Sequence, residues 1–301
     1  MAPRNVIEFP VRKIGGEPPK RHVKGRIIKY IVCTVGAACV TAIMFCLILS
    51  ALNNRSPQHP TLTGSYTTQR GEHRCETLPD ASRACLNTNT VVRYSFNQQT
   101  RNVDLVSGEA SFKVQRDEHR PFEVLSGRLV IRDLSTEFNV YNKIRSILVT
   151  VIDGRVKVMA AIDRASLSKF SHAQVESAWK AAPEYHQLQQ VEFDETTGTL
   201  HELRTLTEQG LSRLLAWQTG RIDLNDRTLG EALDEFSRYQ PIEKFKFQDE
   251  ALRAIHIGGD LQATHLSDFL AVLEAAYHLH HAETTDADGN TVITLSRRQK
   301  H

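Results

Sequence analysis

The chain has 301 residues, 41% of them hydrophobic and 24% charged, which is ordinary for globular proteins and long enough for two domains. This composition excludes a chain that is disordered throughout, and the formal net charge of +2 does not by itself indicate an acidic partner. The charges are unevenly placed, because residues 1–29 hold eight Lys or Arg and only two acids, Glu8 and Glu17.

A run of 23 uncharged residues, Tyr30–Leu52, follows this basic tail. As a helix it would be about 35 Å long, enough to cross the roughly 30 Å hydrocarbon core of a bilayer. The alternative is a cleaved signal peptide, but the run exceeds the usual apolar region and Leu49–Ala51 is a poor cleavage site. The positive-inside rule places the tail (1–29) in the cytoplasm, beside anionic lipid rather than nucleic acid, and the rest outside. We therefore expect a single-span membrane protein with a linker at 53–61.

Residues 62–160 consist of short runs in which apolar and polar residues alternate. The runs are separated by turn signals such as Ser107-Gly108 and Asp153-Gly154. Alternation with period two indicates half-buried strands, so we expect an all-β domain built as a sandwich or a solenoid-like stack. In this pattern Ala110 and Phe112 face the core, while Ser111 lies on the other face.

Cys75 and Cys85 bracket a turn centred on Pro79–Ser82, between two short expected strands. This turn would bring the two thiols near each other, and outside the cytoplasm they could form a structural disulfide. Cross-strand register is not fixed by the sequence, so unbonded cysteines are equally compatible with it.

The remaining residues divide into two parts. Residues 161–214 are polar and show little pattern, so we interpret them as a linker or insertion with room for a short helix. Residues 215–301 carry an internal repeat of strand, turn and helix, which predicts a small α+β domain. Three leucines recur 37 positions later: Leu224, Leu229 and Leu233 become Leu261, Leu266 and Leu270.

Six motifs follow one another in the chain: LPDAS (78–82), LNTNT (86–90), LVSGEASFKVQRDEHRPFEVLSG (105–127), STEFNV (135–140), VTVIDGRVKV (149–158) and WQTGRIDLNDRTLGEALDEFSRY (217–239). The first five, taken in order, resemble the FecR family of transmembrane regulators, and the last resembles the family's C-terminal module. That module is similar to the short N-terminal (STN) domain of secretins and TonB-dependent transporters. The ordered series is specific, whereas each motif alone is not.

This resemblance implies a bacterial inner-membrane signal transducer with its C-terminal bulk in the periplasm. Such proteins sense the signalling domain of a TonB-dependent outer-membrane transporter, often for iron siderophores or haem. They control an extracytoplasmic-function (ECF) sigma factor, as anti-sigma factors or activators, and site proteases cleave them in succession. No cofactor is implied. The alternative is a structural envelope-assembly protein that uses its secretin-like module without direct sigma-factor control.

The tail departs from the family pattern. The family carries several helices before the span, and these bind the sigma factor, whereas 29 residues precede the span here. Such a tail is too short and too rich in proline to bury a core, so we expect it to be disordered. It could bind a sigma factor through the linear motif VIEFPV, but a basic membrane anchor is the favoured interpretation.

Two further departures affect single positions. Some family members cleave themselves at a Gly-Thr bond by attack of the Thr hydroxyl, and Ser135-Thr136 stands there in this chain. Serine adopts the backbone conformations of glycine less easily, so we favour Thr136 as an ordinary strand residue and do not expect an enzyme. Ala81 replaces the glycine of the usual Asp-Gly turn.

The remaining polar residues are expected to have no catalytic or metal-binding role. His278, His280 and His281 follow a helix, where cationic imidazoles suit the carbonyl dipole, so we expect no metal site. Three acids of the β region, Glu109, Glu123 and Asp133, are expected on solvated faces. Three residues are expected to be exposed on the C-terminal domain and to contact a partner: Arg238, Tyr239 and Asp268.

Overall fold

The structure is a computed structural model that describes residues 44, 61–133, 136–160, 171–240, 242–287, 289 and 291–298. The chain divides into two units, residues 1–58 and 59–301, and the elements below belong to the second unit. Within the described ranges, no helix is long and apolar enough to cross a membrane. The expected tail (1–29) and span (30–52, apart from Met44) lie outside the described residues.

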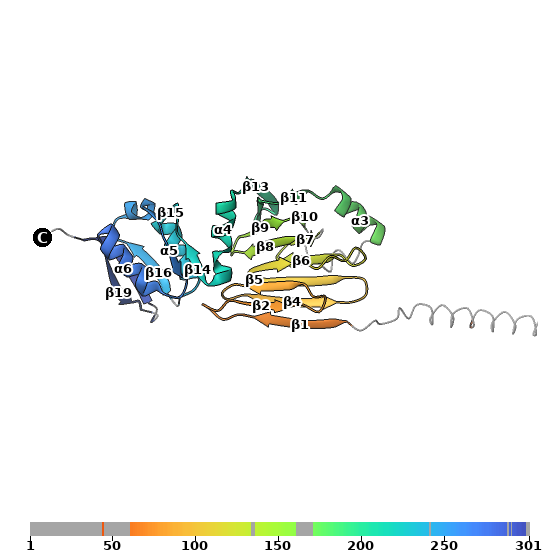
Figure 1. Cartoon of the computed structure of the whole chain (residues 1–301), viewed down its shortest axis with the longest axis horizontal. Helices are drawn as coiled ribbons and strands as arrows, with labels where there is room; N and C mark the ends of the chain where they lie inside the picture. Colours follow the sequence, from red (N-terminus) through yellow and green to blue (C-terminus); the bar gives the residue numbers. More distant parts are fainter. Residues whose placement is uncertain are drawn as a thin grey trace, which may run out of the picture. The chain divides into compact units, whose positions relative to one another are not determined.

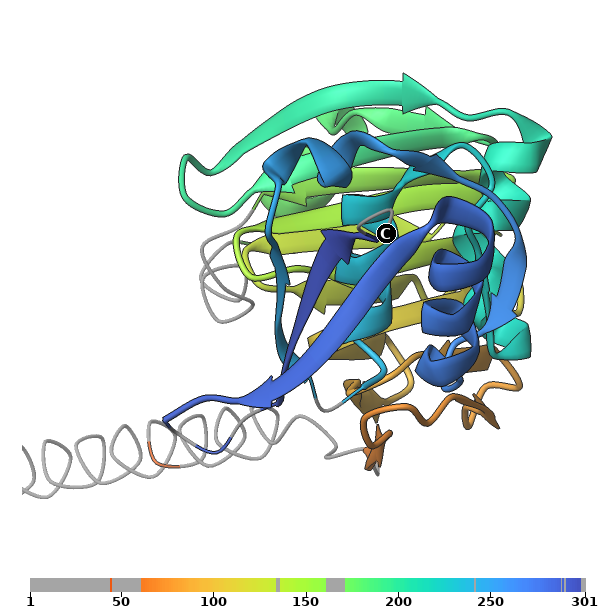
Figure 2. The ribbon, with the colours of Figure 1, turned by 90° about the vertical axis from the view of Figure 1, so that its left-hand side faces the viewer.

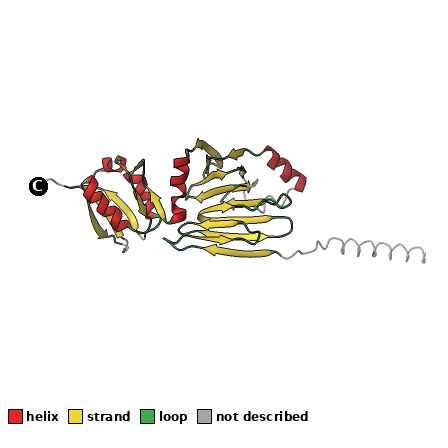
Figure 3. Ribbon diagram, in the orientation of Figure 1, coloured by secondary structure: helices red, strands yellow, loops and turns green. Residues whose placement is uncertain are grey.

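In the described part of residues 59–301 the chain forms twenty strands and a few short helices. Figures 1 and 3 show their arrangement. In the β domain they are β1 (Leu62–Thr67), β2 (Arg74–Thr77), β3 (Arg83–Leu86), β4 (Val91–Phe96), β5 (Arg101–Lys113), β6 (Phe122–Ser126), β7 (Leu129–Asp133), β8 (Glu137–Asn142), β9 (Ser146–Asp153), β10 (Arg155–Ala160), α3 (His172–Ala181), β11 (Glu184–His186), β12 (Gln189–Asp194), β13 (Thr199–Thr205) and α4 (Glu208–Leu215). In the C-terminal module they are η1 (Ala216–Thr219), β14 (Arg221–Asp223), β15 (Arg227–Thr228), α5 (Leu229–Ser237), β16 (Ile242–Phe247), η2 (Glu250–Ala254), β17 (His256–Ile257), β18 (Asp260–Gln262), α6 (Leu266–Tyr277), β19 (Leu279–Thr285) and β20 (Thr291–Arg297).

The β domain consists of two sheets that share the long strand β5. The first part of β5 pairs with β4 and β6, and the second part pairs with β3 and β8. The strand changes sheet at Gly108, whose φ is +85°, next to a bulge in the β4–β5 ladder. A Cβ at this position would lie 2.3 Å from Oγ1 of Thr90, so only glycine fits. The hairpin of β9 and β10 joins the same two sheets a second time.

Side chains from both sheets enclose one apolar core. Ala110 and Phe112 are fully buried in it, as their alternation with polar neighbours predicts. The rings of Phe112 and Phe138 lie 5.5 Å apart across β5 and β8. The mostly β architecture expected for residues 62–160 is present, with the two sheets packed on each other rather than stacked as a solenoid.

Residues 161–214 differ from the expected linker or insertion, because most of the described part completes the β domain. Strand β11 extends one sheet beside β10, and β12 with β13 extends the other beside β9. Val191 and Phe193 of β12 enter the core, so the short alternation in this segment is a true strand signal. Helix α3 packs through Trp179, whose ring lies 4.4 Å from the guanidinium of Arg132.

The C-terminal module contains the two predicted repeats around one core. Helices α5 and α6 stack Phe236 on Phe269, with ring centroids 4.5 Å apart. The strands of the two repeats pair with each other, so Ile222 of β14 faces Leu261 of β18. A sheet of β16, β20 and β19 closes the module, and Figure 2 shows the hairpin of β19 and β20 in blue.

Candidate functional site at the junction of the β domain and the C-terminal module

A row of polar side chains crosses the outer face of the sheet that contains β3, β5, β8, β9 and β12. Cross-strand pairing places these residues side by side. All of them are buried, although the outer face of a sheet is normally exposed to water. The row, whose members are 1% to 8% exposed, consists of Ser111, Asn139, Thr150 and Gln190, and the disulfide-bonded Cys85 continues it on β3. Since buried polar groups need partners, this face must be covered by another part of the protein. The C-terminal module and α4 supply part of this cover.

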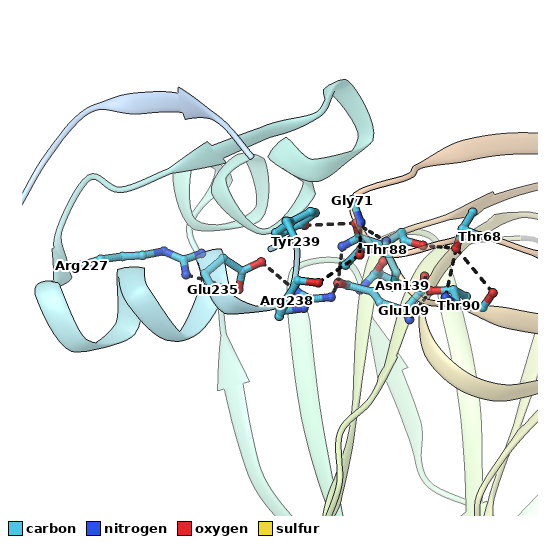
Figure 4. A network of polar contacts seen from close by, with 11 residues as sticks. Thr68, Gly71, Thr88, Thr90, Glu109, Asn139, Arg227, Glu235, Arg238 and Tyr239 are labelled. Atoms are coloured by element: carbon cyan, nitrogen blue, oxygen red, sulfur yellow. Dashed lines mark hydrogen bonds and ion pairs between the residues drawn. The ribbon is translucent and has the colours of Figure 1, made fainter. Parts of the chain in front are cut away.

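Glu109, one row further along β5, is the centre of this junction (Figure 4). Its side chain is 4% exposed. Its carboxylate accepts hydrogen bonds from Nδ2 of Asn87 at 2.8 Å and Nδ2 of Asn139 at 2.9 Å. The third donor is Nη2 of Arg238, at 2.5 Å, from the end of α5. These three donors take the place of the water that the carboxylate loses on burial.

Arg238 therefore belongs to both parts of the protein. Within its own module it forms an ion pair with Glu235 at 2.7 Å, and across the junction it lies 4.1 Å from the ring centre of Tyr141 in β8. Desolvation alone would lower the pKa of Arg238, but the carboxylates of Glu109 and Glu235 raise it well above its ordinary value. The guanidinium is thus a permanent positive charge at this place.

The residues next to Arg238 bind two loops of the β domain. The hydroxyl of Tyr239 donates to Oδ1 of Asn87 at 3.0 Å, and burial raises the pKa of this tyrosine. The carbonyl of Arg238 accepts a hydrogen bond from Oγ1 of Thr88, at 3.1 Å, which in turn accepts one from the backbone N–H of Gly71 (Figure 4). The loop at LNTNT, one of the motifs noted above, is thereby fixed against the end of α5.

The structure corrects the positions expected for several of these residues. Arg238 and Tyr239 were expected on the surface as partner contacts, but both are covered by the β domain. Asp268 lies in the first turn of α6 with 63% of its side chain exposed, 3.2 Å from His265. Glu109 and Ser111 alternate with apolar neighbours in β5 as residues of a solvated outer face would, so the sequence pattern does not reveal the junction.

The other two acids expected on solvated faces are covered as well. Glu123 forms a half-buried ion pair with Arg132 at 2.8 Å, beside Glu176 of α3. Asp133 is buried and accepts a hydrogen bond from the hydroxyl of Thr136. Alternation places Glu109 and Glu123 on outer faces, but it does not show that the C-terminal module or α3 covers those faces. Asp133 instead has the parity of Ile131, which lies in the core.

The cysteines lie directly opposite each other on β2 and β3, and the structure joins Cys75 and Cys85 in a disulfide. Cys85 also packs into the apolar core of the C-terminal module, so the disulfide contributes to the junction. The turn between the two strands has Ala81 at a φ of +67°, the conformation that favours glycine. Asp80 of this turn forms a buried ion pair with Arg101 at 2.8 Å.

The residues considered for self-cleavage and for metal binding lie in two separate parts of the protein. Thr136 is buried beside Asp133, while Ser135 lies outside the described residues. His280 and His281 both approach the carboxylate of Glu274, at 3.5 Å and 3.0 Å. Among the residues that the structure places, no group of three or more His, Cys, Asp or Glu is arranged to hold a metal ion.

A cavity of about 420 Å³ flanks the Glu109–Arg238 pair on the side of α4. Three buried polar atoms that have no hydrogen-bond partner within the described chain belong to residues of its lining: Oδ1 of Asn139, Nε of Arg213 and Nε1 of Trp217. Trp217 is one of two tryptophans in the chain. Because it lines this cavity, its fluorescence should change when the junction opens.

Comparisons with known proteins agree with this architecture. The sequence profile described as FecR protein matches residues 64–157 of the chain. Two crystal structures of a proposed anti-sigma factor from Parabacteroides distasonis, at 1.65 Å and 2.50 Å resolution, resemble it in fold. Their TM-scores are 0.57 and 0.56, their identities are 22% and 21%, and the similarity covers 78% and 79% of this chain and 100% of theirs. No curated protein matches the chain in sequence. Residues 64–157, which lie within the β domain, thus match the FecR family in sequence.

Proposed function

We propose that the protein is an inner-membrane signal transducer that relays the state of a TonB-dependent outer-membrane transporter to an ECF sigma factor, in iron or haem uptake. Support comes from the FecR match of the β domain and from the fold shared with a proposed anti-sigma factor. The uncharged apolar run at 30–52 is long enough for the membrane span that such a relay needs, which also supports the proposal.

The observation that carries the proposal is the buried Glu109–Arg238 pair. It connects the C-terminal module, where a partner would bind, to the β domain that follows the predicted span in the chain. Because both charges are desolvated, separating them leaves an unpaired buried charge, which costs about 3–5 kcal/mol. The module and the β domain therefore respond to a bound partner as one body or separate in a discrete step.

The proposal can be tested in cells that lack the protein. We expect expression of TonB-dependent transporter genes to change under iron limitation, and the intact gene to restore it. A full-length protein with Arg238→Ala should restore it incompletely, while Arg221→Ala, which removes an exposed ion pair with Asp260, should restore it fully. Unchanged transporter expression together with an altered outer-membrane complex would instead favour the structural envelope role.

A further inference from the structure

A second hollow, of about 820 Å³, shares Tyr141, Lys143 and Arg238 with the cavity at α4. Four segments of the β domain contribute to it: the loop after β1, the loop before β4, the middle of β5, and the β8–β9 hairpin around its turn. The C-terminal module contributes the end of α5, at Ser237 and Arg238. The hollow thus opens directly onto the junction, which makes it a place where a ligand would contact both parts of the protein.

The charged residues that line this hollow are all cationic. They are Arg70, Lys143, Arg145 and Arg238, and no Asp or Glu is among the lining residues. Arg238 is neutralised by its ion pairs with Glu109 and Glu235. The other three cations are exposed and form no ion pair within the described ranges of the chain. A concave surface lined by one sign of charge concentrates ligands of the opposite sign.

The neutral part of the lining also favours a particular occupant. Its remaining polar side chains are hydroxyls and amides, which can donate to and accept from a peptide backbone: Thr88, Asn89, Ser107, Asn142, Ser146 and Ser237. Ile144 stands at the tip of the β8–β9 turn, between Lys143 and Arg145, and 98% of it is exposed. An apolar side chain among cations offers a small hydrophobic contact beside the charge contacts.

We propose that this hollow binds an acidic segment of a protein partner. Its carboxylates would pair with Arg70, Lys143 and Arg145, and an apolar side chain would pack on Ile144. We favour a peptide over a phospholipid surface, because the hydroxyls and amides of the lining suit a peptide backbone. This site goes beyond the proposed function, since it lies at the junction and does not require the partner to be a transporter.

The test uses the full chain in neutral detergent micelles and a fluorescein-labelled peptide of alternating glutamate and leucine. Fluorescence anisotropy at about 50 mM salt should show binding that weakens as salt rises, because exposed ion pairs are screened. Lys143→Glu with Arg145→Glu should lower the affinity at least about tenfold, and Ile144→Ser should lower it several-fold. A peptide with lysine in place of glutamate should not bind.

The matched control is Arg83→Glu with Arg93→Glu, which changes the net charge equally at two exposed strand positions outside the hollow. Equal melting temperatures would show that both double variants are folded. The proposal is overturned if the intact chain does not bind the peptide, or if the control pair weakens binding as much as the Lys143/Arg145 pair. Displacement of the peptide by inorganic phosphate, or by micelles doped with phosphatidylglycerol, would also overturn it in favour of a phosphate or lipid ligand.

Discussion

Nη2 of Arg238 lies 2.5 Å from Oε2 of Glu109, although 129 positions separate the two residues in the sequence. The pair joins the end of α5 to the middle of β5 and is almost fully removed from solvent. Two further residues of the β domain, Asn87 and Asn139, complete the shell of the carboxylate. The stability of the junction therefore depends on each charge keeping its partner.

Arg238→Ala should lower the free energy of unfolding by about 3–5 kcal/mol, because it leaves the carboxylate of Glu109 buried without its cation. Adding Glu109→Gln should restore part of this loss, since the double variant has no unpaired carboxylate there. Urea unfolding followed by the fluorescence of Trp217 measures both effects. Arg221→Ala, which opens an ion pair whose side chains are 39% and 46% exposed, should cost less than about 1 kcal/mol. Similar losses for Arg238→Ala and Arg221→Ala would contradict the role assigned to the junction.

Stability should fall steeply above pH 10 because of Tyr141. Burial raises the pKa of its hydroxyl to about 12, against 10.0 for an exposed tyrosine. Between these values the unfolded chain loses the proton while the folded chain keeps it, so the free energy of unfolding decreases as pH rises. The loss attributable to Tyr141 is on the order of 2 kcal/mol. Tyr141→Phe should lose less stability between pH 9.5 and pH 11.5 than the unchanged protein, as measured by urea unfolding; equal losses would show that this tyrosine is not responsible.

Replacing both Cys75 and Cys85 by serine should cost about 3 kcal/mol, because the disulfide closes a short loop that the unfolded chain otherwise explores freely. The loss should appear as a lower melting temperature in calorimetry. Reducing agent should have the same effect on the unchanged protein and none on the double variant. A reductant-insensitive melting temperature would mean that the bond does not form.

Ala81→Gly should raise the free energy of unfolding by about 0.5–1 kcal/mol, since the residue holds a φ of +67° that glycine adopts without strain. The comparison is Ala282→Gly, at an exposed position in strand β19, where glycine should instead destabilise by a similar amount. Chemical denaturation of the two variants should therefore give changes of opposite sign. Destabilisation by both would show that the turn at Ala81 is not strained.

The purified chain should remain uncleaved between Ser135 and Thr136. Thr136 is buried and its hydroxyl donates to Asp133, which fits a structural role. Electrophoresis under denaturing conditions should show a single full-length band after prolonged incubation. Two fragments that disappear in Thr136→Ala would instead establish self-cleavage at this bond.

The sequence by itself determined the local features of this protein. Alternation in β5 placed Ala110 and Phe112 in the core, and the repeated leucines placed α5 and α6 in one module, because strand and helix periods are properties of neighbouring residues. The ordered motifs likewise indicated the FecR family. Short and irregular alternation is a weaker indicator of a strand. For this reason residues 161–214 look like a linker or insertion in the sequence, although β11, β12 and β13 complete both sheets.

Only the tertiary structure decided which polar faces are covered. In a strand, a residue such as Glu109 alternates with apolar neighbours in the same way whether water or another domain lies against it. Arg238 and Tyr239 follow an amphipathic helix and look equally suited to the surface or to a junction. Their burial depends on contacts between residues more than 100 positions apart, which no local pattern encodes. Sequence alternation therefore identified the outer face of the sheet, and long-range packing made that face the junction.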